Sequence, residues 1–279
     1  MSRHTYKNHR STWVESCIAF ILSLTFLLKI RRVLMRFLPF LKLQSQVKNI
    51  VYLSWLVDIE HVRSRYPEQV QLWEKQGKTI FTILTYQHAH FGFSFLGKLR
   101  KLMPSPQQSN WRFYIDPKQQ EKTAIFEQVA VDQLLYVLSG RLASDAMPAQ
   151  FATVFQHQQH AEQVHTQISI DARYRLSSSI RLNDEQQLPA AWQTFFGSWD
   201  KAIRYLVDQE HAWVEWVDQP SKMSQGDIIM PFDFSKIQSA QALAVDCPLL
   251  EEWGVNPQDA FAFVVPTLDF YVMNENPVA

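Results

Sequence analysis

Short apolar runs bounded by turn residues dominate the chain from residue 49 onward. Three of these runs are rich in β-branched and aromatic residues, a composition typical of strands. We therefore predict strands at 49–57, 79–87 and 109–115. Asp58 follows the first run and suits the N-cap of a short helix over residues 59–66, which ends at a proline.

The middle of the chain changes its pattern. Over residues 123–139 the spacing of apolar residues fits a helix better than a strand, and Gly140 supplies its stop. Three runs of strand character follow at 151–157, 164–170 and 174–182, and we predict that they form successive antiparallel strands.

The last third returns to β structure after one helical region. We predict helices at 189–207 and near 249–253, and strands at 211–217, 228–234 and 260–272. Many antiparallel strands with a few inserted helices indicate an α+β fold, not a doubly wound sheet. No linker-like stretch interrupts the body, so we expect a basic and apolar extension (1–44) followed by one domain (45–279).

Charge is unevenly distributed, although the net charge is zero. Residues 1–49 hold nine of the 27 Lys and Arg residues and, in Glu15, one of the 27 acidic residues. The remaining body is acidic, which makes nucleic acid an unsuitable partner because duplex binding depends on neutralised phosphates. The two cysteines, Cys17 and Cys247, form no CxxC pair, so we expect a reducing, cytoplasmic location.

The N-terminal segment contains one apolar run, 17–28, between basic clusters. Its twelve residues fall short of the roughly 20 that span a bilayer. Three interpretations remain open: an interfacial helix that contacts an anionic membrane through residues 13–43, a poorly inserted anchor, or an extension preceding a natural start at Met35. We favour the extension.

Four motifs occur in order along the body: YLSWLVDIEHVRSRYPEQVQLW (52–73), SNWRFYID (109–116), LSGRLASDAMPAQF (138–151) and HAWVEWVDQP (211–220). Together they make residues 45–275 resemble the YqjF-like family of uncharacterised bacterial proteins, which is grouped by fold with acetoacetate decarboxylase. The resemblance implies a closed or nearly closed antiparallel β-barrel, with a few inserted helices and a central pocket.

The resemblance also identifies a missing catalytic group. In acetoacetate decarboxylases the pocket lysine lies in a Gly-Arg-Glu-x-x-Gly-x-Pro-Lys-Lys run, whereas this chain has Leu142 at the glutamate position and Ala149 and Gln150 after the proline. Neither residue supplies the amine that Schiff-base catalysis requires. Lys118 and Lys122 lie nearby in a polar turn, where we expect them to be exposed and unreactive.

The sequence contains no motif for nucleophilic hydrolysis, nucleotide binding or metal catalysis. The chain has no nucleophile elbow, P-loop or dinucleotide fingerprint, so we predict no cofactor. Histidines occur close together, but without metal-ligand spacing, and we expect them to be hydrogen-bonded or partly exposed instead of forming a metal site. They are His88, His90, His157, His160 and His165.

Arg112 and Arg141 are the most informative charged residues. An arginine inside a barrel needs an anionic partner, and a ligand carboxylate could provide it through a bidentate contact. Tyr114 shares a strand face with Arg112 and could donate a further hydrogen bond. The alternative is an internal ion pair with Asp145 or Glu127.

Three functions remain open. The first is a cytoplasmic barrel that binds a small organic acid through Arg112, Tyr114 or Arg141 without Schiff-base catalysis. The second is a lyase of decarboxylase or aldolase type, acting on a keto acid through a relocated lysine. The third is a peripheral membrane or partner-docking protein. The sequence leaves open whether the chain is an enzyme, which ligand it takes and what its oligomeric state is.

Overall fold

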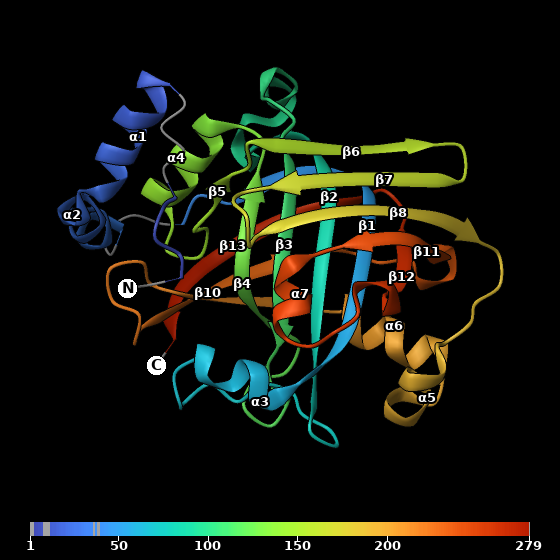
Figure 1. Ribbon diagram of the computed structural model, residues 1–279. Coiled ribbons are helices and arrows are strands. Elements are labelled where there is room, and N and C mark those ends of the chain that lie inside the picture. The colour runs from blue at the N-terminus through green and yellow to red at the C-terminus, as the bar shows by residue number, and fades with distance from the viewer. Residues whose placement is uncertain (1–2, 8–11, 36, 38–39, 279) are drawn as a thin grey trace.

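The computed structural model describes residues 3–7, 12–35, 37 and 40–278. Its strands form one sheet (Figure 1) and are β1 (Leu43–Asp58), β2 (Lys78–Phe93), β3 (Gln107–Tyr114), β4 (Thr123–Val131), β5 (Gln150–Phe151), β6 (Val154–His160), β7 (Gln163–Ser169), β8 (Arg175–Asn183), β9 (His211–Glu215), β10 (Met223–Ile229), β11 (Gln238–Asp246), β12 (Phe261–Val265) and β13 (Leu268–Val278).

The α-helices are α1 (Trp13–Ser23), α2 (Thr25–Met35), α3 (Ile59–Val62), α4 (Leu134–Ala143), α5 (Ala190–Phe196), α6 (Trp199–Val207) and α7 (Pro248–Glu252). Short 3-10 helices are η1 (Arg63–Arg65), η2 (Ser94–Leu102), η3 (Phe234–Lys236) and η4 (Pro257–Asp259).

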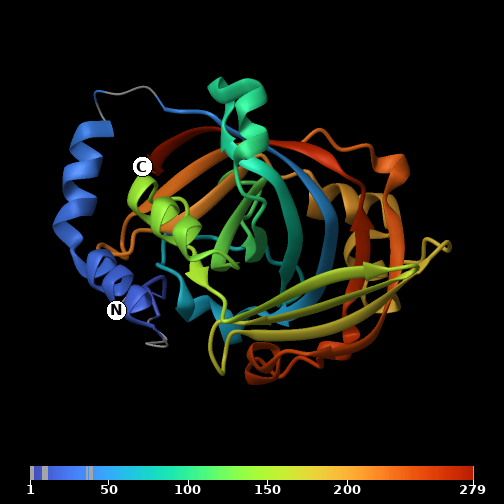
Figure 2. The ribbon, with the colours of Figure 1, turned by 90° about the horizontal axis from the view of Figure 1, so that it is seen from above.

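A barrel closes at one end of the sheet. The strands follow the order β13-β10-β9-β4-β3-β2-β1, and β1 then pairs with β13, with Leu43 opposite Val272. Seen from above in Figure 2, these strands curve around a common interior. The predicted α+β barrel is confirmed, with one difference: β4 and β9 pair in parallel, so the barrel is mixed.

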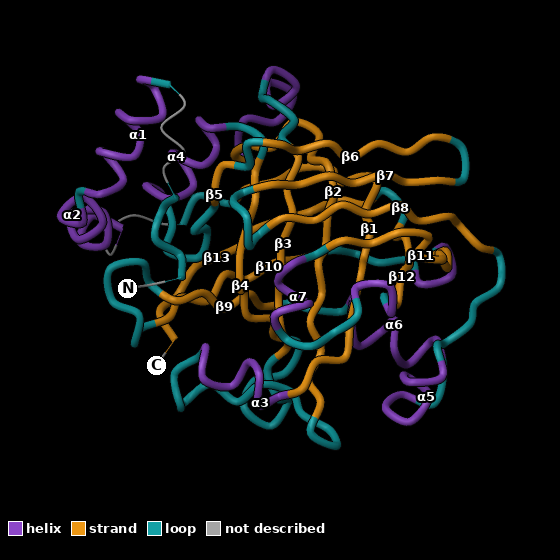
Figure 3. Tube along the Cα trace, viewed as in Figure 1, coloured by secondary structure: helices purple, strands orange, loops and turns teal. Residues whose placement is uncertain are grey.

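The strand β1 belongs to both halves of the sheet. Its register shifts between Lys48 and Val51, where Asn49 has φ 53°, a left-handed conformation that asparagine tolerates better than most residues. Beyond this bulge β1 pairs with β12, and the sheet continues through β11, β8, β7 and β6. In Figure 3, β6, β7 and β8 cross in front of β1, β2 and β3, and residues of β7 and β8 share an apolar layer with those strands.

Two apolar layers lie on opposite faces of the barrel strands. On β3, Trp111 and Phe113 pack in one layer with residues of β1, β2, β8 and α7. Tyr114 belongs to a second layer on the opposite face, with residues of β1, β2, β12 and the helix α6. Successive strand residues alternate between faces, so Arg112 shares this second face with Tyr114.

The predicted helix over residues 123–139 is wrong in its first half, which forms β4. All nine residues of β4 are buried, because both faces are covered: Ile125 and Ala130 belong to one apolar layer, and Phe126 and Val129 to another that includes α4. A strand buried on both faces shows no alternation and is difficult to distinguish from a helix by periodicity. Gly140 lies inside α4, which ends at Ala143, and does not stop it.

Smaller errors concern strand and helix ends. The strand predicted at 228–234 is wrong for most of its range, because β10 spans Met223–Ile229 and η3 begins at Phe234, and β11 was not predicted. Asp58 makes no side-chain capping bond to α3; its carboxylate instead accepts a hydrogen bond from Lys78 Nζ at 3.0 Å. The region predicted as one strand at 260–272 forms two strands, β12 and β13. The remaining predicted strands and helices are present, with longer strands at β1 and β2.

The N-terminal helices α1 and α2 lie against α4 beside the barrel (Figures 1 and 2). Within the described ranges no single helix has the length and apolar composition to cross a bilayer. The pair α1 and α2, bent by 61°, meets those two criteria together.

Candidate functional site

A cavity of about 680 Å³ opens where the N-terminal segment meets the barrel. This volume lies within the range of small-molecule sites. Segments far apart in the sequence form its walls, and four of the lining side chains are cationic. The lining residues are Arg3, Thr5, Tyr6, Lys7, Ser64, Arg65, Arg173, Tyr174, Glu215 and Pro220.

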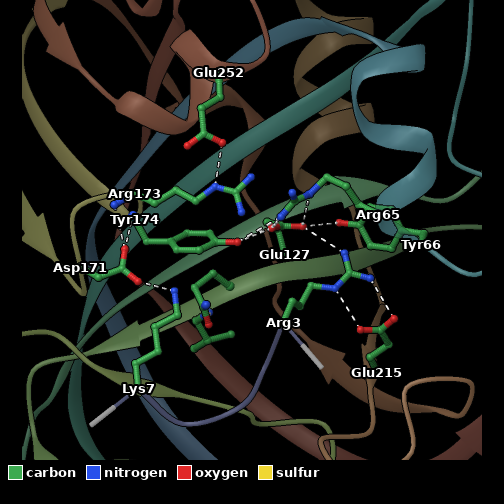
Figure 4. A network of polar contacts seen from close by, with 12 residues as sticks. Arg3, Lys7, Arg65, Tyr66, Glu127, Asp171, Arg173, Tyr174, Glu215 and Glu252 are labelled. Carbon is green, nitrogen blue, oxygen red and sulfur yellow. Dashed lines mark hydrogen bonds and ion pairs between the residues drawn. The ribbon is translucent and has the colours of Figure 1, made fainter. Parts of the chain in front are cut away.

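Glu127 anchors the inner side of this site (Figure 4). It lies on β4 and is fully buried. Its carboxylate accepts hydrogen bonds from Tyr174 Oη at 2.7 Å, Tyr66 Oη at 3.1 Å and Arg3 Nη1 at 3.1 Å. Arg65 also donates to both carboxylate oxygens, through Nη2 and Nε. Two cations and two hydroxyls therefore satisfy one buried carboxylate.

Two local sequence features position the residues that donate hydrogen bonds to Glu127. Tyr66 precedes Pro67, which restricts it to extended backbone, and it has φ −118° and ψ 150°. The helical turn η1 therefore ends at Arg65. The backbone amides of Arg173 and Tyr174 both donate to Asp171 Oδ1, at 2.9 and 2.8 Å, and this turn orients Tyr174 toward Glu127.

The same contacts shift the titration of Glu127. Burial alone would raise the pKa of the carboxyl, but the charges of Arg3 and Arg65 and the hydrogen bonds outweigh it and lower the pKa to about 2. Burial and the neighbouring Glu127 carboxylate raise the pKa of Tyr174, so its hydroxyl stays protonated and donates.

This shift predicts a specific acid sensitivity. Because the folded pKa lies below the unfolded value of 4.5, the stabilisation is present above pH 4.5 and is lost as the pH falls toward about 2. Urea unfolding measured across this window should show a steep loss of stability. The Glu127→Gln variant lacks the titrating group, so its stability should depend less on pH; equal slopes in both proteins would refute this assignment.

Two further cations lie at the rim of the cavity. Lys7 Nζ pairs with Asp171 and lies 4.0 Å from the ring centroid of Tyr174. Arg173 Nε donates to Glu252 at 2.8 Å, and this pair is exposed. Figure 4 shows both cations on the two sides of the Tyr174 ring.

The N-terminal segment is fixed to the barrel by its backbone. Gln150 Oε1 accepts from the backbone amide of Lys7 at 2.9 Å, and Gln150 Nε2 donates to Thr5 O at 2.8 Å. Arg141 donates to His4 O, and also to Pro148 O and Ala149 O at 2.8 and 2.9 Å. Gln150 is the second residue after the proline where the resemblance expects lysines, so Lys7 is held beside that position.

The sequence-predicted ligand residues lie elsewhere. Arg112, Tyr114 and Arg141 are buried and do not line the cavity. Arg141 binds three backbone carbonyls, and burial lowers its pKa to about 10. Within the described chain, the internal acids considered as partners pair with other residues: Glu127 with Arg3 and Arg65, and Asp145 with Arg31 and Arg32.

Arg112 contacts the C-terminal end of α6. Its Nη2 donates to Leu206 O at 2.9 Å, one residue before the helix ends, and Tyr114 Oη lies 3.3 Å from the same carbonyl. Unpaired carbonyls and the helix dipole make this end partially negative, which favours a cation there. The helix terminus therefore stabilises the buried guanidinium.

Replacing Arg112 with methionine tests this role. The change leaves the Leu206 carbonyl without its charged donor, and we expect a loss of about 1–3 kcal/mol in the free energy of unfolding. Arg181→Met, at an exposed position on β8, is the control and should change stability by less than about 0.5 kcal/mol. Unchanged stability with lost carboxylate binding would instead assign Arg112 to a ligand.

The buried histidines are hydrogen-bonded within the sheet. His88 contacts Ser45 Oγ at 2.7 Å and Gln108 Oε1 at 3.2 Å, and burial lowers its pKa to about 4. His157 contacts Thr166 Oγ1 at 2.8 Å and the bulge carbonyl of Asn49 at 2.6 Å. No group of three or more metal-binding side chains occurs in the part of the chain that the structure describes. Lys118 and Lys122 are exposed, as predicted.

Comparisons with known proteins agree with this architecture. The model of the DUF2071 family, an uncharacterized conserved protein (COG2071), matches residues 44–265. No curated protein matches.

Solved structures of similar fold share little sequence with this chain. The enduracididine biosynthesis enzyme MppR complexed with pyruvate is 14% identical, with a TM-score of 0.60 over 87% of this chain and 91% of that one. Acetoacetate decarboxylase from Legionella pneumophila is 9% identical, with a TM-score of 0.58 over 85% and 87%. An acetoacetate decarboxylase-like enzyme from Sphingomonas wittichii RW1 is 10% identical, with a TM-score of 0.52 over 85% and 92%. At these identities the likeness establishes the fold alone.

Proposed function

We propose that this chain, which belongs to the DUF2071 family, binds a small organic acid in the cavity beside Glu127, without Schiff-base chemistry from residues 149 and 150. The observation that carries the proposal is the lining of the cavity, where Arg3, Lys7, Arg65 and Arg173 occur together with Tyr174 and the cations of Lys7 and Arg173 lie over the Tyr174 ring. Cationic donors around an aromatic surface suit a carboxylate attached to a small carbon skeleton.

The deep and outer cations have different parts in this proposal. Arg3 and Arg65 hold the buried Glu127, so displacing them would leave a buried charge unpaired. Lys7 and Arg173 pair with Asp171 Oδ2 and Glu252 Oε2, and the two acidic side chains are 32% and 45% exposed, so water can solvate these oxygens when the cations are released. A ligand carboxylate therefore takes over the two cations at low cost, while Asp171 Oδ1 keeps its backbone hydrogen bonds and the inner cluster provides a fixed wall.

Arg173→Gln tests the outer cation. We expect about a tenfold or greater weakening of carboxylate binding, because a charged hydrogen bond to the ligand is lost. Stability should change little, since the Arg173–Glu252 pair is exposed. Binding would be measured by isothermal titration calorimetry with a panel of small monocarboxylates and 2-oxo acids.

Arg175→Gln is the matched control, because Arg175 lies two residues further along, forms an exposed pair with Asp246 and does not line the cavity. Its affinity should equal that of the unchanged protein. If both variants bound the carboxylate equally weakly, the loss of affinity would come from the overall surface charge and not from the cavity, which would contradict the proposal.

A second candidate function follows from Lys7, whose amine is in the cavity next to the position where the resemblance expects a lysine. It would make the chain a lyase that acts on a keto acid through a relocated lysine. The present geometry disfavours it, since the Asp171 carboxylate already engages Lys7 Nζ in an ion pair.

Borohydride trapping distinguishes the two candidates. The protein is incubated with small keto acids, reduced and examined by intact-protein mass spectrometry, with an acetoacetate decarboxylase as positive control. Carboxylate binding without an adduct supports the first candidate. An adduct that maps to Lys7 and disappears in Lys7→Arg, which keeps the charge but removes the amine nucleophile, supports the second.

A further inference from the structure

The helices α1 and α2 turn their apolar residues toward solvent. On α2, Phe26, Ile30 and Val33 are exposed and lie on one face at helical spacing. On α1, Trp13, Cys17 and Phe20 repeat the arrangement, and Trp13 is 79% exposed. A helix on the surface of a globular protein normally presents the opposite, polar face to water.

Ion pairs fix this orientation. Arg32 donates to Asp145 at 2.7 Å through Nε and to Asp218 at 2.7 Å through Nη2, and its guanidinium lies 3.8 Å from the ring centroid of Trp216. Arg31 pairs with Asp145 as well. Because the cationic face of α2 is directed at the barrel, the apolar face of the helix is held outward.

A second exposed apolar segment adjoins the connection between α2 and β1. In η2, Phe95, Leu99 and Leu102 are exposed, at 70%, 62% and 78%. Ser94 N donates to Lys42 O at 2.8 Å and Phe93 pairs with Leu43, so η2 lies beside the end of this connection. Figure 2 shows η2 where the chain from α2 enters β1.

The helix α4 joins these elements into one surface. It packs against both α1 and α2, and Tyr136 Oη donates to Phe91 O, close to η2, at 2.6 Å. Leu135, also on α4, is 73% exposed. The exposed apolar residues of α1, α2, α4 and η2 form what we call the helical face.

The charges of the helical face identify its partner. Exposed lysines flank the apolar residues at 29, 42, 98 and 101. The sequence contains no acidic residue from 16 to 57 or from 75 to 115. In a symmetric dimer through this face these lysines would meet like charges, which disfavours a second copy. An anionic membrane surface suits both kinds of residue, because the apolar side chains insert at the boundary between headgroups and acyl chains and the lysines pair with the lipid phosphates.

We propose that the helical face docks the protein on the surface of an anionic membrane, with the apolar side chains in the headgroup region and the lysines among the lipid phosphates. This attachment is interfacial, and the barrel stays outside the bilayer.

Vesicle sedimentation of the full chain tests the proposal. We expect binding to phosphatidylcholine vesicles that contain phosphatidylglycerol, and at least about tenfold weaker binding to phosphatidylcholine alone. Phe95→Ser combined with Leu102→Ser should weaken binding about tenfold or more, because two apolar anchors are lost. Both positions are highly exposed, so the fold should be unaffected, as circular dichroism would verify.

Leu243→Ser is the control, since Leu243 is an exposed leucine on β11, in the part of the sheet away from α1 and α2. It should bind vesicles like the unchanged protein. The proposal is overturned if neither vesicle type binds, if both bind equally, or if sedimentation velocity shows a dimer that Phe95→Ser and Leu102→Ser abolish while vesicles fail to bind.

Discussion

Replacing Glu127 with glutamine is expected to lower the free energy of unfolding by about 3–5 kcal/mol, the largest effect of any single change considered. The carboxylate is fully buried and is the shared counter-ion of Arg3 and Arg65. Glutamine preserves the shape but removes the charge, and its amide hydrogens would face guanidinium donors. Two cations at the inner wall of the cavity would then lack their common anion.

Urea unfolding at neutral pH measures this change. Glu60→Gln is the control, because Glu60 is exposed and lies 3.6 Å from Arg63, an ion pair expected to contribute less than about 1 kcal/mol. If Glu127→Gln were no more destabilising than Glu60→Gln, the buried cluster would not be the anchor of the site.

A chain that begins at Met35 should be destabilised by at least about 3 kcal/mol, because it loses two sets of buried or partly buried ion pairs. Removing Arg3 takes one cation from Glu127 and one from Glu215. Removing Arg32 and its neighbour leaves Asp145 and Asp218 without their partners. The N-terminal segment thus packs as part of the fold and supplies one wall of the cavity.

A shorter truncation separates these two contributions. A chain that begins at Thr12 removes Arg3 and Lys7 but keeps α1 and α2, so it should lose organic-acid binding and only part of the stability. Calorimetry and urea unfolding would be compared for all three chains. If the chain from Met35 were as stable as the full chain, residues 1–34 would be a dispensable extension.

The strands of the barrel could be predicted because their boundaries carry local signals, whereas their closure into a barrel was implied by the resemblance. Asp58 ends β1, the turn at Gly77 precedes β2, and Asp116 and Pro117 follow β3. The strand β4 gave no such signal, because both of its faces are covered. The alternation of apolar and polar residues shows which face of a strand is buried, and a strand that is buried on both faces has no such alternation.

The site was harder to predict than the fold. Glu127 contacts Arg65 and Arg3, which are 62 and 124 residues away along the sequence, so no local spacing of residues connects them. From the sequence we expect Arg112 inside the barrel, with a ligand carboxylate or an internal acid as its partner. Arg112 is buried, but its partner is the Leu206 carbonyl at the end of α6, 94 residues away, and no local spacing connects these two either.

The central claim is that the cavity recognises a carboxylate, and calorimetry with matched ligand pairs tests it most directly. Each small monocarboxylate or 2-oxo acid would be titrated beside its neutral amide, which has nearly the same shape but no charge. The account predicts saturable binding of at least one acid and about a tenfold or greater loss with its amide. Equal affinity for acid and amide, or no binding across the panel, would contradict it.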